Sequence, residues 1–178
     1  MKRLKKTVVL VGMMGAGKTS VGRRLAAALS VPFRDADIEI EAAAGCTISD
    51  IFELFGEEAF RAGERKVLTR LLRESPHVLA TGGGAFIDPG TRTKIKERAI
   101  SVWLKADIEL LIERVARKDH RPLLQNTDRR TAMENLLRTR EPIYAESDIT
   151  VLSDDGPHET VVKRILAALE QRADGVSE

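Results

Sequence analysis

The sequence is short of cysteine and of long hydrophobic runs. Cys46 is the only cysteine among 178 residues, so no intrachain disulfide can form, which fits a reducing cytoplasm. We expect Cys46 to be a small, half-buried packing residue rather than a catalytic thiol. No stretch approaches the roughly 20 consecutive apolar residues that a membrane helix requires, so we expect no membrane span and no membrane partner.

The chain also lacks an excess of charge of either sign. Lysine and arginine number 29 against 27 for aspartate and glutamate, which argues against nucleic acid as the main partner. The N-terminal "MKRLKK" followed by "TVVLVGMM" imitates a signal peptide, but "GAGKTS" follows at once. A buried parallel strand explains the same apolar run better. We expect a soluble, cytoplasmic protein, and because nothing in the sequence demands an oligomer, we expect a monomer.

Short apolar segments alternate with longer helical patterns. The strand-like segments span residues 7–12, 32–37, 77–82, 100–105 and 148–153. The stretch 48–75 is helical in pattern, with a break near Gly56 and Ser49 as the expected N-cap. This alternation predicts an α/β fold in which helices cover both faces of a parallel sheet. Because no linker or internal repeat divides the chain, we expect one domain over residues 1–178.

A glycine-rich stretch, "GMMGAGKT" at residues 12–19, lies between a predicted strand and a predicted helix. It matches the phosphate-binding pattern G-x-x-x-x-G-K-[ST]. Backbone N–H groups of such a loop can surround phosphate oxygens, and the helix dipole adds to the field. Lys18 would reach the β- and γ-phosphates, and Thr19 would take one position on Mg²⁺. The alternative is a turn that binds nothing, but the complete pattern in this context favours a nucleoside triphosphate.

Two carboxylates, Asp35 and Asp37, follow the second predicted strand. One could reach the water shell of Mg²⁺, and the other could orient an acceptor hydroxyl. The alternative is that they cap the helix that begins there. The strand before "TGGGA" at residues 81–85 lacks the usual acidic Walker B ending, so Asp35 is the expected helper of the metal.

A second glycine-rich stretch, "TGGGA" at residues 81–85, follows a predicted core strand. Three glycines are costly to order, so we expect the backbone to approach a ligand there, at the carboxyl end of the strand. Upstream, Arg61 and Glu64 lie three residues apart on one helical face. They form either a plain surface ion pair or an arginine fork for a substrate carboxylate, held by Glu64.

Cations gather late in the chain, in "RVARKDHRPLL" at residues 114–124 and in "RTREPIYAE". Arg121 could move onto the transferred phosphoryl group, and Arg140 could bind an anion. The alternatives are a solvated helix end and a cation at a helix C-terminus. On charge alone, the solvated helix end is the favoured interpretation of the segment that contains Arg121.

In combination these motifs resemble the shikimate kinase family over essentially the full chain. "GMMGAGKTSVGRRLA" is similar to the ATP-loop signature of that family, and the spacing from Arg61 and Glu64 to "VLATGGGAF" is similar to its second signature. "RPLL" and R-x-P-x-Y are similar to its lid and late substrate arginine. Met13 and Ser20 differ slightly from the family's usual residues.

The resemblance implies a three-layer P-loop kinase fold with a five-stranded parallel sheet flanked by helices and a lid. It places an acceptor-binding region at about 33–62 and the lid at about 112–126. It implies transfer of the γ-phosphoryl group of ATP, with Mg²⁺, to the 3-hydroxyl of shikimate. The product, shikimate 3-phosphate, leads to chorismate and the aromatic amino acids.

The resemblance also implies a role for each site residue. Asp37 would orient and deprotonate the attacking hydroxyl, with Lys18 and Arg121 as further catalytic groups. The remaining acceptor ligands would be Arg61, Gly83, Gly84 and Arg140. The nucleotide ligands would be Gly15, Ala16, Gly17, Lys18, Thr19, Ser20, Arg121, Arg114 on one face of adenine and Pro157 on the other. Mg²⁺ would be held by Thr19 and Asp35, and the acceptor pocket would be walled by Phe52 and Phe60.

Two alternatives remain open on the sequence alone. Gluconate, like shikimate, has a carboxylate and hydroxyls, so a gluconate kinase on the same fold is the nearest rival. A nucleotide-binding regulatory module would keep the loop but would have no need of Asp37, Arg61, Arg121 and Arg140. A nucleoside acceptor fits poorly, because it needs an aromatic slot and aromatic residues make up only 4% of the chain.

Overall fold

The computed structural model of the chain describes residues 4–119 and 126–174. The elements in chain order are β1 (Thr7–Val11), α1 (Lys18–Leu29), β2 (Phe33–Asp35), α2 (Ala36–Ala44), α3 (Ile48–Leu71), β3 (Val78–Ala80), the short 3₁₀ helix η1 (Ala85–Ile87), α4 (Pro89–Arg98), β4 (Ala99–Lys105), α5 (Ile108–Asp119), α6 (Asn126–Tyr144), β5 (Ile149–Leu152) and α7 (His158–Asp174). Each of the five strands expected from the sequence is present. Within the described ranges, no helix has the length and apolar character needed to cross a bilayer.

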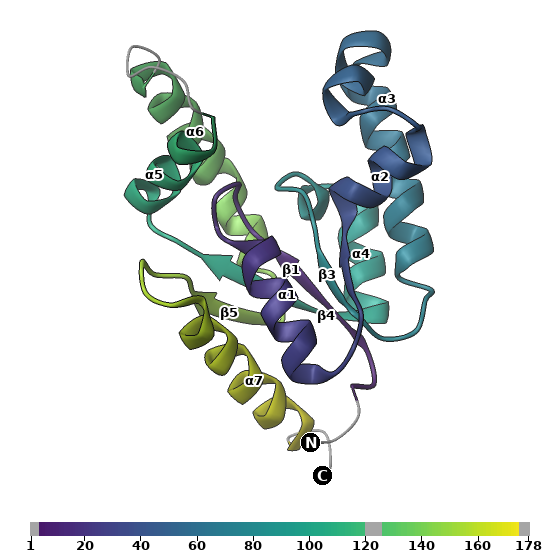
Figure 1. Ribbon diagram of the computed structural model, residues 1–178, viewed down its shortest axis with the longest axis vertical. Coiled ribbons are helices and arrows are strands. Elements are labelled where there is room, and N and C mark those ends of the chain that lie inside the picture. Colours follow the sequence, from purple (N-terminus) through teal and green to yellow (C-terminus); the bar gives the residue numbers. More distant parts are fainter. Residues whose placement is uncertain (1–3, 120–125, 175–178) are drawn as a thin grey trace.

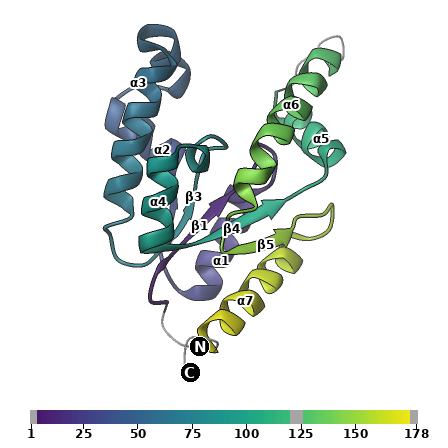
Figure 2. The same ribbon diagram turned by 180° about the vertical axis from the view of Figure 1, so that it is seen from behind.

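The strands form one parallel sheet in the order β2-β3-β1-β4-β5. Strand β1 lies at the centre, and all five of its residues are buried, as a strand covered on both faces requires. Helix α1 lies in front of the sheet and α4 behind it in Figure 1, and the reverse view in Figure 2 shows the same two layers. The α/β fold predicted from the alternation of strands and helices is confirmed.

Two helical arms rise on either side of the centre of the molecule (Figures 1 and 2). Helices α2 and α3 form one arm, and α5 and α6 form the other. Two loops lie between the bases of these arms: the one from β1 to α1 and the one from β3 to η1. Because parallel strands all end at the same edge of a sheet, both loops lie where open α/β sheets bind ligands.

Helix α3 contains the break expected at Gly56, whose φ of 83° and ψ of 173° are not helical. The expected N-cap, Ser49, is wrong. Thr47 caps the helix instead, because its backbone is extended and its side chain accepts a hydrogen bond from the amide of Asp50. Asp50 in turn accepts one from the amide of Thr47, which completes a capping box, while Ser49 already lies in the first turn. The helix ends at Leu71 rather than at residue 75.

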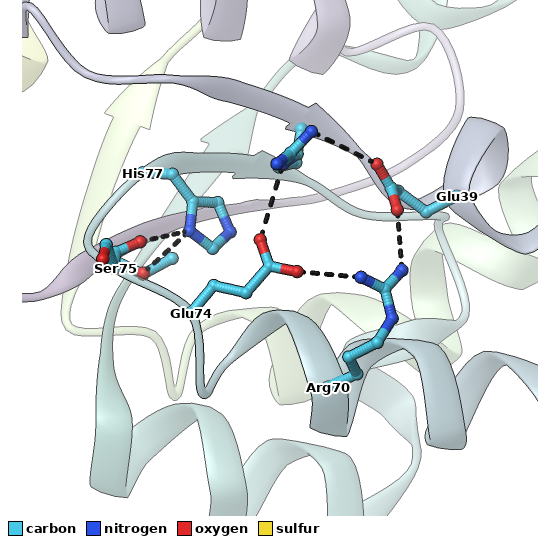
Figure 3. Close-up of polar contacts among 7 residues, drawn as sticks. Glu39, Arg70, Glu74, Ser75 and His77 are labelled. Atoms are coloured by element: carbon cyan, nitrogen blue, oxygen red, sulfur yellow. Dashed lines mark hydrogen bonds and ion pairs between the residues drawn. The ribbon is translucent and has the colours of Figure 1, made fainter.

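Four charged side chains connect β2, α2 and the end of α3 in a closed ring of ion pairs. Arg70 lies 2.6 Å from Glu39 and 2.8 Å from Glu74, and Arg34 lies 3.7 Å from Glu39 and 3.5 Å from Glu74. Figure 3 shows Glu39, Arg70 and Glu74 facing one another. A single exposed pair contributes little, but a network holds its members together at a lower entropic cost. The ring therefore holds the start of α2, two residues after Asp37, against α3.

Candidate active site

The loop between β1 and α1 is built to bring main-chain atoms close to a ligand. Gly12 and Gly17 have φ values of 140° and 91°, a region in which a side chain is strained. A β-carbon on Gly12 would also lie 2.8 Å from the carbonyl oxygen of Leu104. Helix α1 begins after Gly17 with no side-chain cap and no acidic residue in its first turn. Its N-terminal amides therefore remain available for an anion.

Lys18 lies across the same loop. Its Nζ donates hydrogen bonds to the carbonyl oxygens of Gly12 at 2.7 Å and Met13 at 2.8 Å. Burial lowers the pKa of Lys18 from 10.5 to about 8; Asp37 opposes this shift, and Lys118 adds to it. The sequence motifs did not single out Lys118, although it belongs to the basic run that begins at residue 114. Helix α5 lies beside the phosphate loop, because a β-carbon on Gly15 would be 3.0 Å from the carbonyl oxygen of Leu111.

The expected metal ligands lie together. The hydroxyl of Thr19 donates to Oδ2 of Asp35 at 2.9 Å, while Oδ1 of Asp35 accepts from the amide of Asp37 at 3.0 Å. Of the two aspartates, Asp35 is therefore the N-cap of α2. Residues 4–119 and 126–174 contain no group of three or more His, Cys, Asp or Glu residues that could hold a metal ion. One hydroxyl and one carboxylate suit Mg²⁺, which keeps water and phosphate oxygens as its other ligands.

The segment Gly82–Gly84 follows β3, and carboxylates approach its first residue. A β-carbon on Gly82 would lie 3.3 Å from Oδ1 of Asp37 and 3.3 Å from Oε2 of Glu64. Glu64 is 2% exposed, and its Oε2 has no hydrogen-bond partner among the described residues. Burial raises the pKa of Glu64, whereas its hydrogen bond from Arg61 lowers it. This burial could not be predicted from the sequence, because the spacing to Arg61 also suits a surface ion pair.

Guanidinium groups approach the other two glycines. A β-carbon on Gly83 would lie 3.2 Å from Nη1 of Arg140, and one on Gly84 would lie 2.6 Å from Nη1 of Arg61. Nη1 of Arg61 donates a hydrogen bond to Oε1 of Glu64 at 2.8 Å, so the buried carboxylate orients the guanidinium. Gly83 also lies beside the phosphate loop, because a β-carbon on Gly83 would be 3.6 Å from the carbonyl oxygen of Gly12. The two arginines, far apart in the sequence, therefore meet at one segment of main chain.

Asp37 faces this segment from α2. The residue is exposed to solvent, but protein atoms lie close around its carboxyl group. Loss of water around the carboxyl group raises the pKa of Asp37, and Asp35 raises it further, while Lys18 lowers it. Two carboxylates and an ammonium group therefore share the space between the phosphate loop and Gly82.

Other predicted site residues lie on either side. Arg114 donates to the carbonyl oxygen of Asp154 at 2.7 Å and to that of Gly15 at 3.3 Å, so it joins the phosphate loop to the loop that contains Pro157. Stacking of adenine between Arg114 and Pro157 stays a prediction. Arg121 lies outside the described residues.

The aromatic residues expected to wall the acceptor pocket pack together on α3. The ring centroids of Phe52 and Phe60 are 4.7 Å apart, and Phe60 is buried while Phe52 is 40% exposed. The guanidinium of Arg61 lies 5.1 Å from the centre of the Phe60 ring. This contact adds a cation–π interaction to the ion pair that orients Arg61.

The sheet order, the phosphate loop and the lysine at its end define an α/β P-loop kinase. The sequence profile described as shikimate kinase matches residues 14–170. A shikimate kinase of Caulobacter vibrioides is 59% identical over 166 residues, 93% of this chain and 83% of that protein. The shikimate kinase from Acinetobacter baumannii, solved in complex with shikimate, is similar with a TM-score of 0.88 and 40% identity over 96% of both chains. The chain belongs to the shikimate kinase family, as the motifs predicted.

A kinase of the rival acceptor, gluconate, is less similar to this chain in sequence and in structure. A gluconokinase from Sinorhizobium meliloti matches 98% of this chain and 97% of its own with a TM-score of 0.65, but at 21% identity. That level of identity shows a common fold alone. The gluconate alternative therefore gains no further support from the comparison.

The lowered pKa of Lys18 predicts a pH dependence of nucleotide binding. Phosphate oxygens favour the ammonium form, so the pKa in the complex lies above the value of about 8 in the free protein. Affinity for ADP should stay constant below this pH and fall above it, with uptake of about one proton per nucleotide at about pH 9. Calorimetry in two buffers of different ionisation enthalpy measures the uptake.

The control for this experiment is Lys18→Arg, because guanidinium stays charged throughout this pH range. In that variant the proton uptake should disappear wherever binding persists. An uptake of the same size in both proteins would show that a group other than Lys18 titrates.

Proposed function

We propose that this kinase transfers the γ-phosphoryl group of ATP to the 3-hydroxyl of shikimate, giving shikimate 3-phosphate on the route to the aromatic amino acids. The approach of Asp37, Arg61 and Arg140 to one glycine segment beside the phosphate loop carries the proposal. Shikimate presents one carboxylate and three hydroxyls. The site offers two guanidinium groups, a carboxylate and backbone amides, which complement that set of groups. Membership of the shikimate kinase family supports the same acceptor.

Arg61 and Arg140 are proposed to bind the acceptor carboxylate. Guanidinium groups suit this task because they form paired, charge-assisted hydrogen bonds with a carboxylate. The amides of Gly83 and Gly84 would bind ring hydroxyls. Both guanidinium groups lie where β-carbons on these glycines would contact them, Arg140 at Gly83 and Arg61 at Gly84. An acceptor bound by the two arginines would therefore also contact the main chain, which supports this assignment.

Asp37 is proposed to orient the attacking hydroxyl and to accept its proton. A carboxylate whose pKa is raised by burial and by Asp35 is a stronger base than a solvated one. The ammonium group of Lys18 interacts electrostatically with Asp37 and lowers the pKa of its carboxyl group. This closeness supports an arrangement in which hydroxyl and phosphate meet between the two side chains.

The nucleotide is proposed to lie along the phosphate loop, with the ligands Gly15, Ala16, Gly17, Lys18, Thr19, Ser20, Arg114 and Pro157. Mg²⁺ would be held by Thr19 and Asp35, and when bound it would neutralise charge on the phosphates. Arg121 would contact the same phosphates. The lid expected at about 112–126 includes Arg121 and stays a prediction, as does the acceptor-binding region at about 33–62.

The proposal implies small-molecule partners only. Shikimate and ATP would be the substrates of a cytoplasmic monomer that needs neither nucleic acid nor a membrane. The near balance of 29 basic and 27 acidic residues agrees with this, because it gives no broad field for a polyanion.

An acceptor panel tests the proposal directly. ADP release from ATP should be measured with shikimate, quinate, gluconate and AMP, and shikimate should exceed the others by about 100-fold or more in kcat/KM. Turnover of another acceptor without turnover of shikimate would reject the assignment. ATP binding without turnover of any acceptor would favour the regulatory module.

Asp37→Asn should remove the proton acceptor while preserving shape. We expect kcat to fall by about 100-fold to 10,000-fold with little change in ATP affinity, because the phosphate loop is untouched. Steady-state kinetics and ADP calorimetry measure the two effects. Glu97→Gln, an amide substitution at an exposed position of α4, is the matched control and should leave both unchanged. Turnover near that of the control would exclude Asp37 from the chemistry.

Gly84→Ala should displace Arg61, whose guanidinium lies where the new methyl group would be. Because the far end of a flexible side chain can move aside, the fold should persist while KM for shikimate rises about tenfold and KM for ATP stays within about twofold.

Gly63→Ala is the control, since nothing lies within 4 Å of its added β-carbon in α3. It should leave both KM values unchanged and stabilise the helix by about 0.5–1 kcal/mol in thermal unfolding. Equal KM values for shikimate in the two variants would refute the placement of Arg61 in the acceptor site.

A further inference from the structure

Tyr144, the last residue of α6, is fully buried, yet its hydroxyl is in contact with the glycine segment. The hydroxyl donates a hydrogen bond to the carbonyl oxygen of Gly83. Its ring lies 5.9 Å from that of Trp103 on β4, and Trp103 in turn would be 3.4 Å from a β-carbon on Gly12. Tyr144 thus touches the segment expected to bind the acceptor and packs on a residue beside the phosphate loop.

The bond to Gly83 restrains more than one atom. The carbonyl of Gly83 and the amide of Gly84 belong to one planar trans peptide, so fixing the oxygen fixes the direction of the N–H. In a trans peptide these two groups point in opposite directions, so the Gly84 N–H points away from Tyr144. Neither glycine has a side chain to limit rotation of this plane. A buried hydroxyl is therefore an effective means of orienting it.

Arg140, one turn earlier on α6, approaches the same glycine as the Tyr144 hydroxyl. Burial raises the pKa of Tyr144, and the positive charge of Arg140 opposes that shift. A phenol can donate one hydrogen bond and still accept others. It can therefore donate to Gly83 and keep its lone pairs free for Arg140, whose Nη1 lies 3.2 Å from the position of a β-carbon on Gly83.

We propose that Tyr144 is a positioning residue that holds the Gly83–Gly84 peptide and the guanidinium of Arg140 in one fixed arrangement for the acceptor. This inference rests on the proposed function of that site. Tyr144 does not touch the reacting atoms; it acts through the peptide and the arginine. Its loss should therefore weaken acceptor binding more than it slows phosphoryl transfer.

Tyr144→Phe tests the role, because phenylalanine keeps the ring packed on Trp103 and removes only the hydroxyl. We expect KM for the acceptor, and its Kd measured by calorimetry without nucleotide, to rise about fivefold to tenfold. The KM for ATP should stay within about twofold and kcat within about threefold. An unchanged acceptor Kd would overturn the proposal, and so would a fall in kcat without a change in KM.

Ser101→Ala is the matched control, since it also removes a buried hydroxyl, one that bonds Asp148 at 2.9 Å rather than the glycine segment. It should lower the melting temperature by about as much as Tyr144→Phe, without changing the acceptor Kd. An equal rise in the acceptor Kd in the two variants would reduce the effect to lost stability and contradict the proposal.

A double-mutant cycle with Arg140→Lys tests whether Tyr144 acts through the arginine. If it does, the penalty of Tyr144→Phe should be clearly smaller in the lysine background. Penalties that multiply independently would overturn the coupling. The acceptor panel on the unaltered protein decides the proposed function separately, because these ratios are measured with whichever acceptor that protein uses best.

Discussion

The rest of the site depends on one constraint, that residues Gly82–Gly84 are all glycines and therefore occupy no side-chain space. Three helices send charged groups to this segment, at distances that β-carbons would fill: Asp37 from α2, Arg61 and Glu64 from α3, and Arg140 from α6. Charged groups that lose water must be compensated by near neighbours or by hydrogen bonds, so the main chain has to leave room for them. Three glycines in succession are entropically costly to order. Two interactions offset that cost: the pairing of the preceding strand β3 with β1, and the hydrogen bond from Tyr144 to Gly83.

The layers of the fold could be predicted because they depend on short apolar runs, of which β1 is the clearest. The ends of helices could not, since they depend on the backbone angles of single residues. Thr47 and Ser49 are both acceptable caps by type, and only the extended backbone of Thr47 decides between them. The same holds for Asp35 and Asp37: both were candidate caps, and the one that ends β2 took the role.

Site residues within one motif could be found from their spacing, whereas contacts between motifs could not. Spacing shows which side chains share a helix face, so the pair of Arg61 and Glu64 was expected. It does not show that Glu64 is buried with one oxygen unpaired, or that Lys118 influences Lys18. Tyr144 was part of the R-x-P-x-Y motif, but the motif assigned no role to it. These properties arise when α3, α5 and α6 pack against the rest of the fold, and spacing within one motif does not show how they pack.

The opposite pKa shifts of Lys18 and Asp37 have one main cause, the loss of surrounding water. Burial disfavours the ammonium of Lys18 and the carboxylate of Asp37 alike, and each partly restores the charge of the other. In the free protein, Lys18 bonds to the carbonyl oxygens of its own loop. A phosphate would favour the ammonium, and a hydroxyl that donates to Asp37 would favour the carboxylate. The site is therefore electrostatically completed by a phosphate beside an alcohol, and neither two anions nor two cations would satisfy both groups.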